Sequence, residues 1–293
     1  MRSWITSGVF ACVLVAAGSA PSSATAPRPR FSGLIAYWSD DPFPTIWKLR
    51  SGARPARILR GGKNAKRPRI SPDRRWVAFD GAPPGKPAMS DFDIQVVRLD
   101  GTGRSTLTPS SKWDVDAQWS PDGKRLAFTR LRPHPSGPEG ASVWIVGLDG
   151  TGLRRLVDGA DARWSPDGAR LVYDAPSSGR PGDLFVVNAD GSGARRLLST
   201  PNLKLAAGWS RDGRRILFTS YGTTNPRDTT MFVMNADGTD VRKLGRGIAA
   251  TWSPDGTKIL YTSAEFSPLF VMNGDGSAKR KLASVSAADP SWR

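Results

Sequence analysis

The stretch Trp119-Ser120-Pro121-Asp122-Gly123 decides the fold, because closely similar stretches recur along the chain at intervals of about 45 residues. In each copy an aromatic residue follows the tryptophan nine positions later. The copies that share the complete pattern pair Trp119 with Phe128, Trp164 with Tyr173, Trp209 with Phe218 and Trp252 with Tyr261. A fifth copy has Ile70 in the tryptophan position and Phe79 as its aromatic residue.

A sixth copy of the repeat is split between the two ends of the chain. Tyr37 has the character of the aromatic residue, but no tryptophan stands nine positions before it. Trp292, one residue from the C-terminus, has no aromatic residue nine positions after it. We therefore expect the strand that ends at Trp292 to complete the first unit and to close a ring.

Each unit has the sequence pattern of four strands. Ser-Pro-Asp-Gly is a tight-turn sequence, because proline presets φ and glycine accepts positive φ. A second turn follows further along, with Asp-Gly between strands of alternating apolar residues, which is a strong hairpin signal. Asp-Gly stands at residues 100, 149, 190, 237 and 275, whereas the first unit has Leu49-Arg50-Ser51-Gly52 instead. The sequence thus predicts an all-β, six-bladed propeller of four-stranded antiparallel blades.

These repeats resemble the WD40-like (PD40) propeller repeats of the TolB family, on the strength of Trp-Ser-Pro-Asp-Gly, the aromatic strand and the Asn-x-Asp-Gly turn. The resemblance implies the propeller fold. It is less specific for function, because similar repeats occur in regulatory propellers of peptidases and in some polysaccharide lyases. TolB carries an α/β domain before its propeller, and we expect this chain to be a free-standing propeller without that domain.

The first residues differ from the rest and predict export. Arg2 precedes an apolar run from Val9 to Ala17, and small residues follow, which is typical of a secretory signal peptide. The domains expected are a signal peptide over residues 1–26, a flexible leader over 27–32 and the propeller over 33–293. Cleavage would remove Cys12, the single cysteine, and leave no transmembrane segment. The expected location is periplasmic, cell-surface or secreted, and nothing predicts an oligomer.

The sequence offers little for metal or cofactor chemistry. His134 is the only histidine, so no histidine-rich metal site can be built. The Asn-x-Asp-Gly turns lack the glutamate that a twelve-residue calcium loop requires. No Gly-x-Ser-x-Gly elbow surrounds a nucleophilic serine. We therefore expect no metal, no cofactor and no catalytic residue, and interpret the protein as non-enzymatic.

Carboxylates form the principal candidate site. Asp114 and Asp116, two apart before Trp119, are expected to share a strand face. Asp161 and Asp289 stand three residues before a repeat tryptophan, as Asp116 does; Arg67, Ala206 and Ala249 hold that position in the other units. Together these aspartates would line the channel mouth and attract a cation or a basic peptide. The alternative, which we favour, is that each aspartate accepts a hydrogen bond from a loop amide.

Two further surfaces are predicted from the topology. The loops opposite the turns differ from one another, and specific ligands often bind such loops; there we add Trp113, Tyr221 and Asp228 to the candidate partner-binding residues. The turn face is expected to be basic, in keeping with the formal net charge of +16. Its representative cations are Arg125, Arg155, Arg196, Arg215, Lys243 and Arg280.

The leading functional hypothesis is a secreted, non-catalytic propeller that binds an envelope protein or another cell-envelope partner through its loop face. One alternative is a hydrolase or lyase that acts on an envelope polymer with carboxylates at the channel mouth. The other is an electrostatic binder of an anionic wall polymer or membrane surface through the basic turn face. We expect no nucleic-acid partner, because no recognition module is present.

Overall fold

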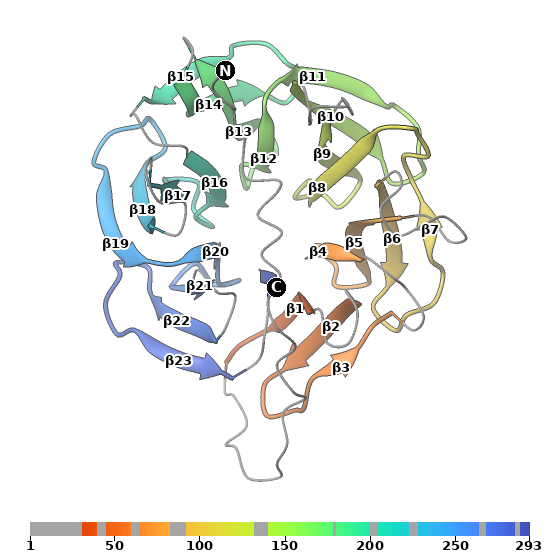
Figure 1. Ribbon diagram of the computed structural model, residues 1–293, viewed down its shortest axis with the longest axis horizontal. Helices are drawn as coiled ribbons and strands as arrows, with labels where there is room; N and C mark the ends of the chain where they lie inside the picture. Colours follow the sequence, from red (N-terminus) through yellow and green to blue (C-terminus); the bar gives the residue numbers. More distant parts are fainter. Residues whose placement is uncertain are drawn as a thin grey trace, which may run out of the picture.

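The computed structural model describes residues 31–39, 45–59, 65–82, 92–131, 140–177, 180–199, 204–222, 228–263, 268–284 and 288–293. In these ranges the chain forms six four-stranded antiparallel sheets arranged as a ring (Figure 1). The predicted six-bladed propeller is confirmed. No helix in the described part of the chain is long and apolar enough to cross a membrane. The expected signal peptide, the start of the leader and His134 lie outside the described residues.

The first three blades in ring order contain twelve strands. The first blade consists of β24 (Ala288–Trp292), β1 (Leu34–Ser39), β2 (Thr45–Arg50) and β3 (Ala56–Arg57). The second consists of β4 (Lys66–Ile70), β5 (Trp76–Gly81), β6 (Asp93–Arg98) and β7 (Ser105–Thr106). The third consists of β8 (Trp113–Trp119), β9 (Arg125–Leu131), β10 (Ala141–Gly147) and β11 (Arg154–Asp158).

The other three blades follow the same plan. The fourth consists of β12 (Ala160–Trp164), β13 (Arg170–Ser177), β14 (Arg180–Asn188) and β15 (Arg195–Leu198). The fifth consists of β16 (Lys204–Trp209), β17 (Arg215–Tyr221), β18 (Thr229–Asn235) and β19 (Arg242–Arg246). The sixth consists of β20 (Ile248–Trp252), β21 (Lys258–Thr262), β22 (Leu269–Asn273) and β23 (Arg280–Ala283).

Side chains of the Ser-Pro-Asp-Gly sequence hold each tight turn. In the third blade Ser120 Oγ donates to Asp122 Oδ1 at 2.5 Å and accepts from the Arg125 N–H at 2.9 Å. Asp122 Oδ1 also accepts from the Lys124 N–H at 3.0 Å. The hydrogen bond from Ser120 and that backbone N–H lower the pKa of Asp122, because they favour the ionised carboxylate. Gly123 supplies the positive φ of the turn, 69°.

The repeat tryptophans and aromatic residues form the core between blades, as predicted. Trp119 is 4% exposed and Phe128 is 1% exposed. The indole N–H of Trp119 donates to the carbonyl of Arg69 in the second blade at 2.8 Å, and that of Trp209 donates to the carbonyl of Arg163 in the fourth blade at 3.1 Å. Each of these rings therefore fills apolar space and also ties its blade to the preceding one.

Strand β24 closes the ring by pairing with β1. Ile35 lies opposite Trp292 and Ala36 lies opposite Ser291 in an antiparallel register. The Arg293 N–H donates to the Leu34 carbonyl at 2.9 Å. In Figure 1 the C-terminus lies near the centre of the ring, beside the first strand of the chain. The C-terminal strand and the first described strand thus belong to one sheet, as the split repeat predicted.

Deletion of residues 288–293 is expected to lower stability strongly, because it removes β24 and leaves β1 with an unpaired inner edge. Loss of the buried Trp292 side chain alone costs about 3 kcal/mol or more, which corresponds to about 10 °C in the melting temperature of a domain of this size. Thermal unfolding followed by circular dichroism measures the change. A truncated chain that melts at the parent temperature would contradict closure by β24.

Candidate functional site in the central channel

The innermost strand of each blade faces the axis of the ring, and neighbouring innermost strands contact one another around it. In the first, second, third, fourth and sixth blades, the residue three positions before the repeat tryptophan (Ile70 in the second blade) has a left-handed backbone. Its φ is 48° at Arg67, 54° at Asp116, 52° at Asp161, 50° at Ala249 and 46° at Asp289. The pairing register of each of these strands shifts there, which marks a β-bulge. The bulge explains why aspartate recurs at this position, since aspartate tolerates positive φ better than most residues.

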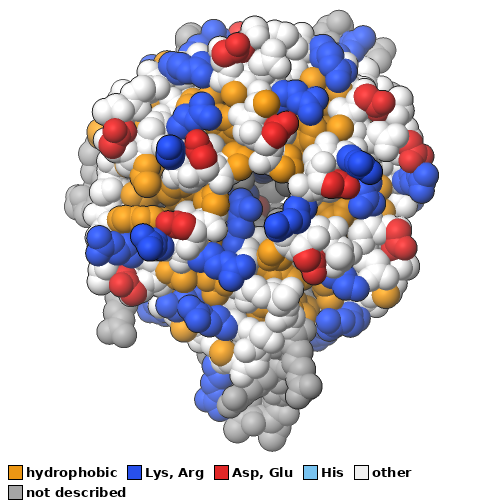
Figure 2. Space-filling model, turned by 180° about the vertical axis from the view of Figure 1, so that it is seen from behind, with side chains coloured by type: hydrophobic (Ala, Val, Ile, Leu, Met, Phe, Trp, Pro, Cys, Tyr) orange, Lys and Arg blue, Asp and Glu red, His pale blue; other side chains and the backbone are white. Residues whose placement is uncertain are grey.

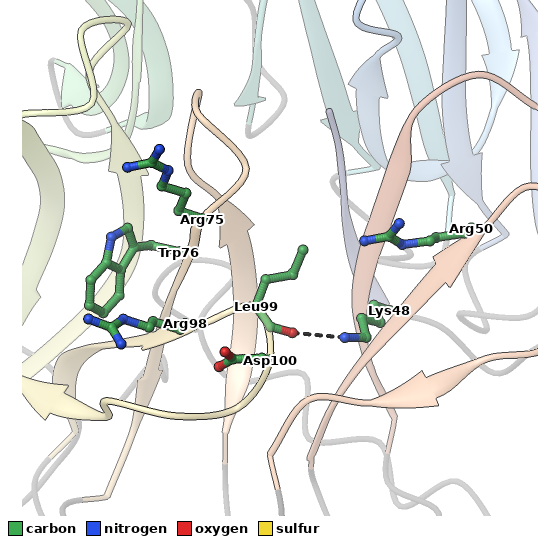
Figure 3. A pocket seen from close by; sticks show the side chains of 7 residues that line it. All are labelled: Lys48, Arg50, Arg75, Trp76, Arg98, Leu99 and Asp100. Atoms are coloured by element: carbon green, nitrogen blue, oxygen red, sulfur yellow. Dashed lines mark hydrogen bonds between the residues drawn. The ribbon is translucent and has the colours of Figure 1, made fainter.

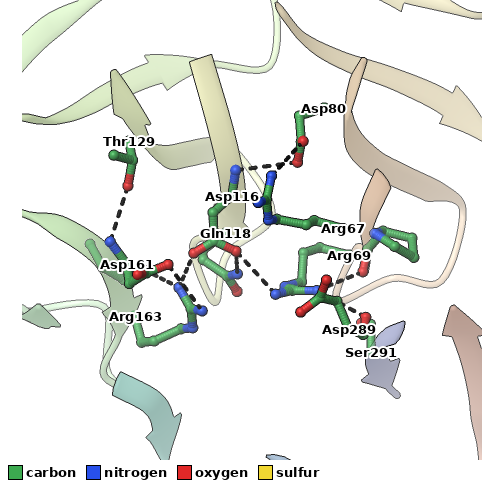
Figure 4. A network of polar contacts seen from close by, with 12 residues as sticks. Arg67, Arg69, Asp80, Asp116, Gln118, Thr129, Asp161, Arg163, Asp289 and Ser291 are labelled. Carbon is green, nitrogen blue, oxygen red and sulfur yellow. Dashed lines mark hydrogen bonds and ion pairs between the residues drawn. The ribbon is translucent and has the colours of Figure 1, made fainter. Parts of the chain in front are cut away.

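A network of charged side chains fills part of the channel (Figure 4). Asp116 lies between arginines of the two flanking blades: its Oδ1 accepts from Arg69 at 3.0 Å and its Oδ2 from Arg163 at 2.5 Å. Although burial alone would raise the pKa of Asp116, Arg163 and Arg69 hold it below its usual value. A second ion pair joins Arg67 to the fully buried Asp80 at 2.9 Å. Burial raises the pKa of Asp80 to about 6, although Arg67 acts to lower it.

A second group of carboxylates has fewer cations around it. Burial and the neighbouring Asp116 raise the pKa of Asp161, and burial together with Asp161 raises the pKa of Asp174. Oδ1 of Asp174 is buried, and no residue in the described ranges donates a hydrogen bond to it. Tyr221, at the loop end of β17, lies close to this group: burial, Asp161, Asp289 and Asp174 raise the pKa of its hydroxyl. We call Asp161, Asp174, Asp289 and Tyr221 the acidic cluster.

Among the described residues, the opposite side of the channel carries small side chains. Gly208 of β16 occupies the position immediately before its tryptophan, where the second and fourth blades have Arg69 and Arg163. A Cβ atom added at Gly208 would meet no atom within 4 Å. In the sixth blade the corresponding positions hold Ala249 and Thr251, which are also small. The channel therefore has a charged wall and, facing it, a wall of small residues.

The structure brings together three of the predicted site aspartates and separates the fourth. Asp116, Asp161 and Asp289 lie in the channel network, and Asp289 Oδ2 accepts from the Trp38 indole at 2.9 Å. Asp114 is fully buried in a two-point pair with Arg130, at 2.7 and 2.6 Å. Asp114 and Asp116 thus contact different arginines, because the bulge begins between their positions in the strand register.

The other predicted partner residues lie toward the loop face. Trp113 is half-buried at the start of β8, and its ring packs edge-on against Phe92 with centroids 5.9 Å apart. Asp228 is exposed and pairs with Arg246. Tyr221 joins the acidic cluster, whereas Trp113 and Asp228 belong to the surrounding surface.

Several cations of the predicted basic face have packing roles. The guanidinium of Arg125 lies 4.9 Å from the ring centroid of Trp164 in the next blade, and Arg215 lies 5.3 Å from Trp252. Such contacts contribute about 0.5–1 kcal/mol at exposed sites. The other four predicted cations, Arg155, Arg196, Lys243 and Arg280, are exposed. Arg155 pairs with Asp158, and Arg196 lies 3.7 Å from Asp183.

Figure 2 shows the face of the disc on which the described turns lie. Lys and Arg side chains surround a hollow at the axis of the ring, and Asp and Glu side chains alternate with further cations outside it. The basic character expected of this face is therefore visible, although carboxylates are interspersed.

Sequence reasoning missed the arginines that bind the channel aspartates. Arg69 and Arg163 stand immediately before Ile70 and Trp164, so their common place in the repeat was a usable signal. Asp80 and Asp174 share another repeat position, directly after the strand aromatics Phe79 and Tyr173. Among the described residues, no group of three or more His, Cys, Asp or Glu is placed to hold a metal ion. The site is instead suited to ion-pairing with charged groups of a ligand.

A closed ring of six four-stranded blades around a channel of paired charges defines the class of six-bladed β-propellers. The chain matches the family described as PD40, TolB beta propeller domain, over residues 50–293, and it belongs to this family. Comparison with curated protein sequences gives no match.

Solved structures of similar fold include two TolB proteins and lyases. TolB from Acinetobacter baumannii superposes with a TM-score of 0.74 at 20% identity, covering 89% of this chain and 67% of that one. A putative TolB from Agrobacterium tumefaciens gives 0.61 at 20% identity, covering 74% and 79%. An oligogalacturonate lyase from Vibrio parahaemolyticus gives 0.59 at 15% identity, covering 88% and 77%. At these identities the likeness concerns the fold.

The substitution Asp161→Asn is expected to stabilise the protein above pH 7 and to have little effect near pH 4. The pKa of Asp161 is raised in the folded state. Its contribution to the stability of the fold is therefore fully present below the ordinary pKa of about 4 and is lost as the pH rises through the folded-state pKa. Asparagine avoids that loss, so we expect a gain of about 1 kcal/mol at pH 8. Thermal melts of both proteins at the two pH values measure it.

Asp122→Asn provides a comparison of opposite sign. The pKa of Asp122 is lowered by its turn contacts, so its carboxylate stabilises the fold above the ordinary pKa and this contribution is lost as the pH falls through the folded value. We expect this variant to be less stable than the parent at pH 8. An Asp161→Asn variant destabilised equally at pH 4 and pH 8 would refute the proposed titration of the acidic cluster.

Proposed function

We propose that the chain is an exported, non-catalytic binding scaffold that receives a cationic segment of a cell-envelope protein at the acidic cluster. The family supports a binding scaffold in general terms. The observation that carries the finer proposal is that Asp161 and Asp174 lie on paired strands of the fourth blade, at the same loop end as Tyr221 of the neighbouring fifth blade. The buried Asp174 Oδ1 has no hydrogen-bond donor in the described part of the chain, so a ligand ammonium or guanidinium would supply one.

The charge balance of the channel supports a cationic ligand. Asp116 already has two arginine partners. Asp161, by contrast, has a long contact of 4.0 Å to Arg163 and shares a side-chain hydrogen bond with Asp116, another carboxylate. Burying carboxylates with few cations is costly, and a cation that enters the cluster relieves that cost. The small residues Gly208 and Ala249 on the opposite wall leave room for such a side chain to approach.

The rest of the loop face would complete the contact. Trp113 and Phe92 form a half-buried aromatic pair, and aromatic residues are frequent anchors in protein interfaces. Asp228 adds an exposed carboxylate near Tyr221 in sequence. Export is proposed from the N-terminal sequence, with its short apolar run and small residues, and the similarity to TolB proteins accords with an envelope location.

The double substitution Asp161→Asn with Asp289→Asn is expected to weaken partner capture about tenfold or more, since each lost ion pair with a partly buried carboxylate costs about 1–3 kcal/mol. The measurement is a pull-down from the native envelope fraction, followed by titration of the identified partner. Both positions have positive φ, which asparagine tolerates, so the fold should persist.

Asp240→Asn is the matched control, because Asp240 also has positive φ but is exposed beside Arg242, away from the channel. It should capture the partner as the parent does. Equal capture by the parent and the double variant would refute the acidic cluster as the binding site.

A second candidate function is enzymatic. The raised pKa of Asp161 is the property that a general acid requires, and lyases are among the proteins of similar fold. In this case the parent would cleave a polymer from a panel of envelope glycans and peptides, and Asp161→Asn would abolish the cleavage. A panel without turnover by the parent would leave the binding scaffold as the better proposal.

A further inference from the structure

A pocket of about 560 Å³ lies between the first and second blades, at the turn face and away from the acidic cluster (Figure 3). Four cations line it: Lys48 and Arg50 from β2, Arg75 before β5, and Arg98 from β6. Its single carboxylate is that of Asp100. We call it the first-blade pocket. Its charge favours an anionic ligand.

Two of the pocket cations, Arg50 and Arg98, occupy a repeat position that holds asparagine in the last three blades. Through strand pairing, Arg50 lies opposite Leu34 and Arg98 lies opposite Trp76. At the matching place in the last three blades an asparagine binds the adjacent turn, as Asn188 does with Ser192 at 3.0 Å. The first two blades thus replace a turn-holding asparagine with an arginine, and both arginines reach one pocket.

Two acids lie beside these cations: Arg75 is 4.0 Å from Asp73, and Asp100 lies near Arg98. Residues 31–39 and 45–59, the described part of the first blade apart from β24, add none. The same ranges hold four cations, namely Lys48, Arg50, Arg54 and Arg57. Other blades carry Asp in their second turns, whereas the first blade lacks the Asp-Gly sequence. This sector of the turn face is therefore locally cationic.

The pocket also has apolar walls. Leu99 and Trp76 line it, and the guanidinium of Arg98 lies 5.3 Å from the Trp76 ring centroid. The ammonium group of Lys48 donates to the Leu99 carbonyl at 2.9 Å, which joins the two blades across the pocket floor. A ligand that fits must combine anionic groups with apolar surface, which bare inorganic anions do not offer.

We propose that the first-blade pocket binds an acidic saccharide chain, with carboxylate groups paired to its arginines and a sugar ring against Leu99 and Trp76. Arg50 and Arg75 are exposed and supply planar donors that match a carboxylate in two-point geometry. A chain with repeated carboxylates also gains from the other cations of the turn face through multivalency. The site is independent of the acidic cluster, which lies toward the loop end of the channel.

The test is isothermal titration of the protein with a size-defined oligogalacturonate at low and physiological salt. We expect saturable binding that weakens as salt rises. The variant Arg50→Gln with Arg98→Gln should lower the affinity about tenfold, and methyl-esterified oligogalacturonate, which lacks the charges, should not bind. Both arginines are exposed, and Arg50→Gln alone provides a second reading if the double variant unfolds.

The matched control is Lys243→Gln with Arg280→Gln, which removes the same charge from exposed positions on β19 and β23. It should change the affinity less than twofold. An equal loss in the two variants would overturn the pocket in favour of diffuse attraction. Polyphosphate, or vesicles with anionic lipid, binding as tightly as the saccharide would overturn the assignment of ligand class. Partner capture by the channel should be unaffected in every arm.

Discussion

The pairing of β24 with β1 is the constraint on which the rest of the molecule depends. Only when Trp292 and Ser291 lie beside Ile35 and Ala36 do six innermost strands surround one axis. The closure also positions Ser291, whose hydroxyl accepts from the Ile70 N–H at 3.1 Å, and Asp289, whose carbonyl accepts from Arg69 at 3.2 Å. Strand β24 is therefore part of the channel as well as part of a sheet.

Closure brings together charges that are far apart in the sequence. Arg69 is separated from Asp116 by 47 residues, and Asp116 from Arg163 by another 47. Buried ion pairs of this kind are weak contributors to stability when compared with apolar residues, but breaking one is costly because it leaves an unpaired charge. The channel network is therefore weak evidence for a gain in stability.

The sequence was sufficient for the architecture and only partly for the site. Trp119 and its equivalents predicted the blades because burial of a large ring and a tight turn are local requirements that recur in every unit. The channel contacts were harder to predict, because a one-residue bulge at Asp116 changes which side chains face the axis. Regular alternation placed Asp114 and Asp116 on one face, whereas the structure pairs Asp114 with Arg130 and Asp116 with Arg69 and Arg163. The first-blade pocket depends on two blades at once, so neither repeat alone indicates it.

The uneven distribution of residues around the channel has a consequence for how a ligand is oriented. Six similar blades present a nearly sixfold backbone, which by itself would accept an incoming segment in six equivalent rotations. Arg69, Asp116 and Arg163 mark one side of the axis, and Gly208 marks the other. A charged ligand would therefore meet six rotational positions of unequal energy. The channel would select the rotation of the ligand about its axis as well as the sign of the ligand's charge.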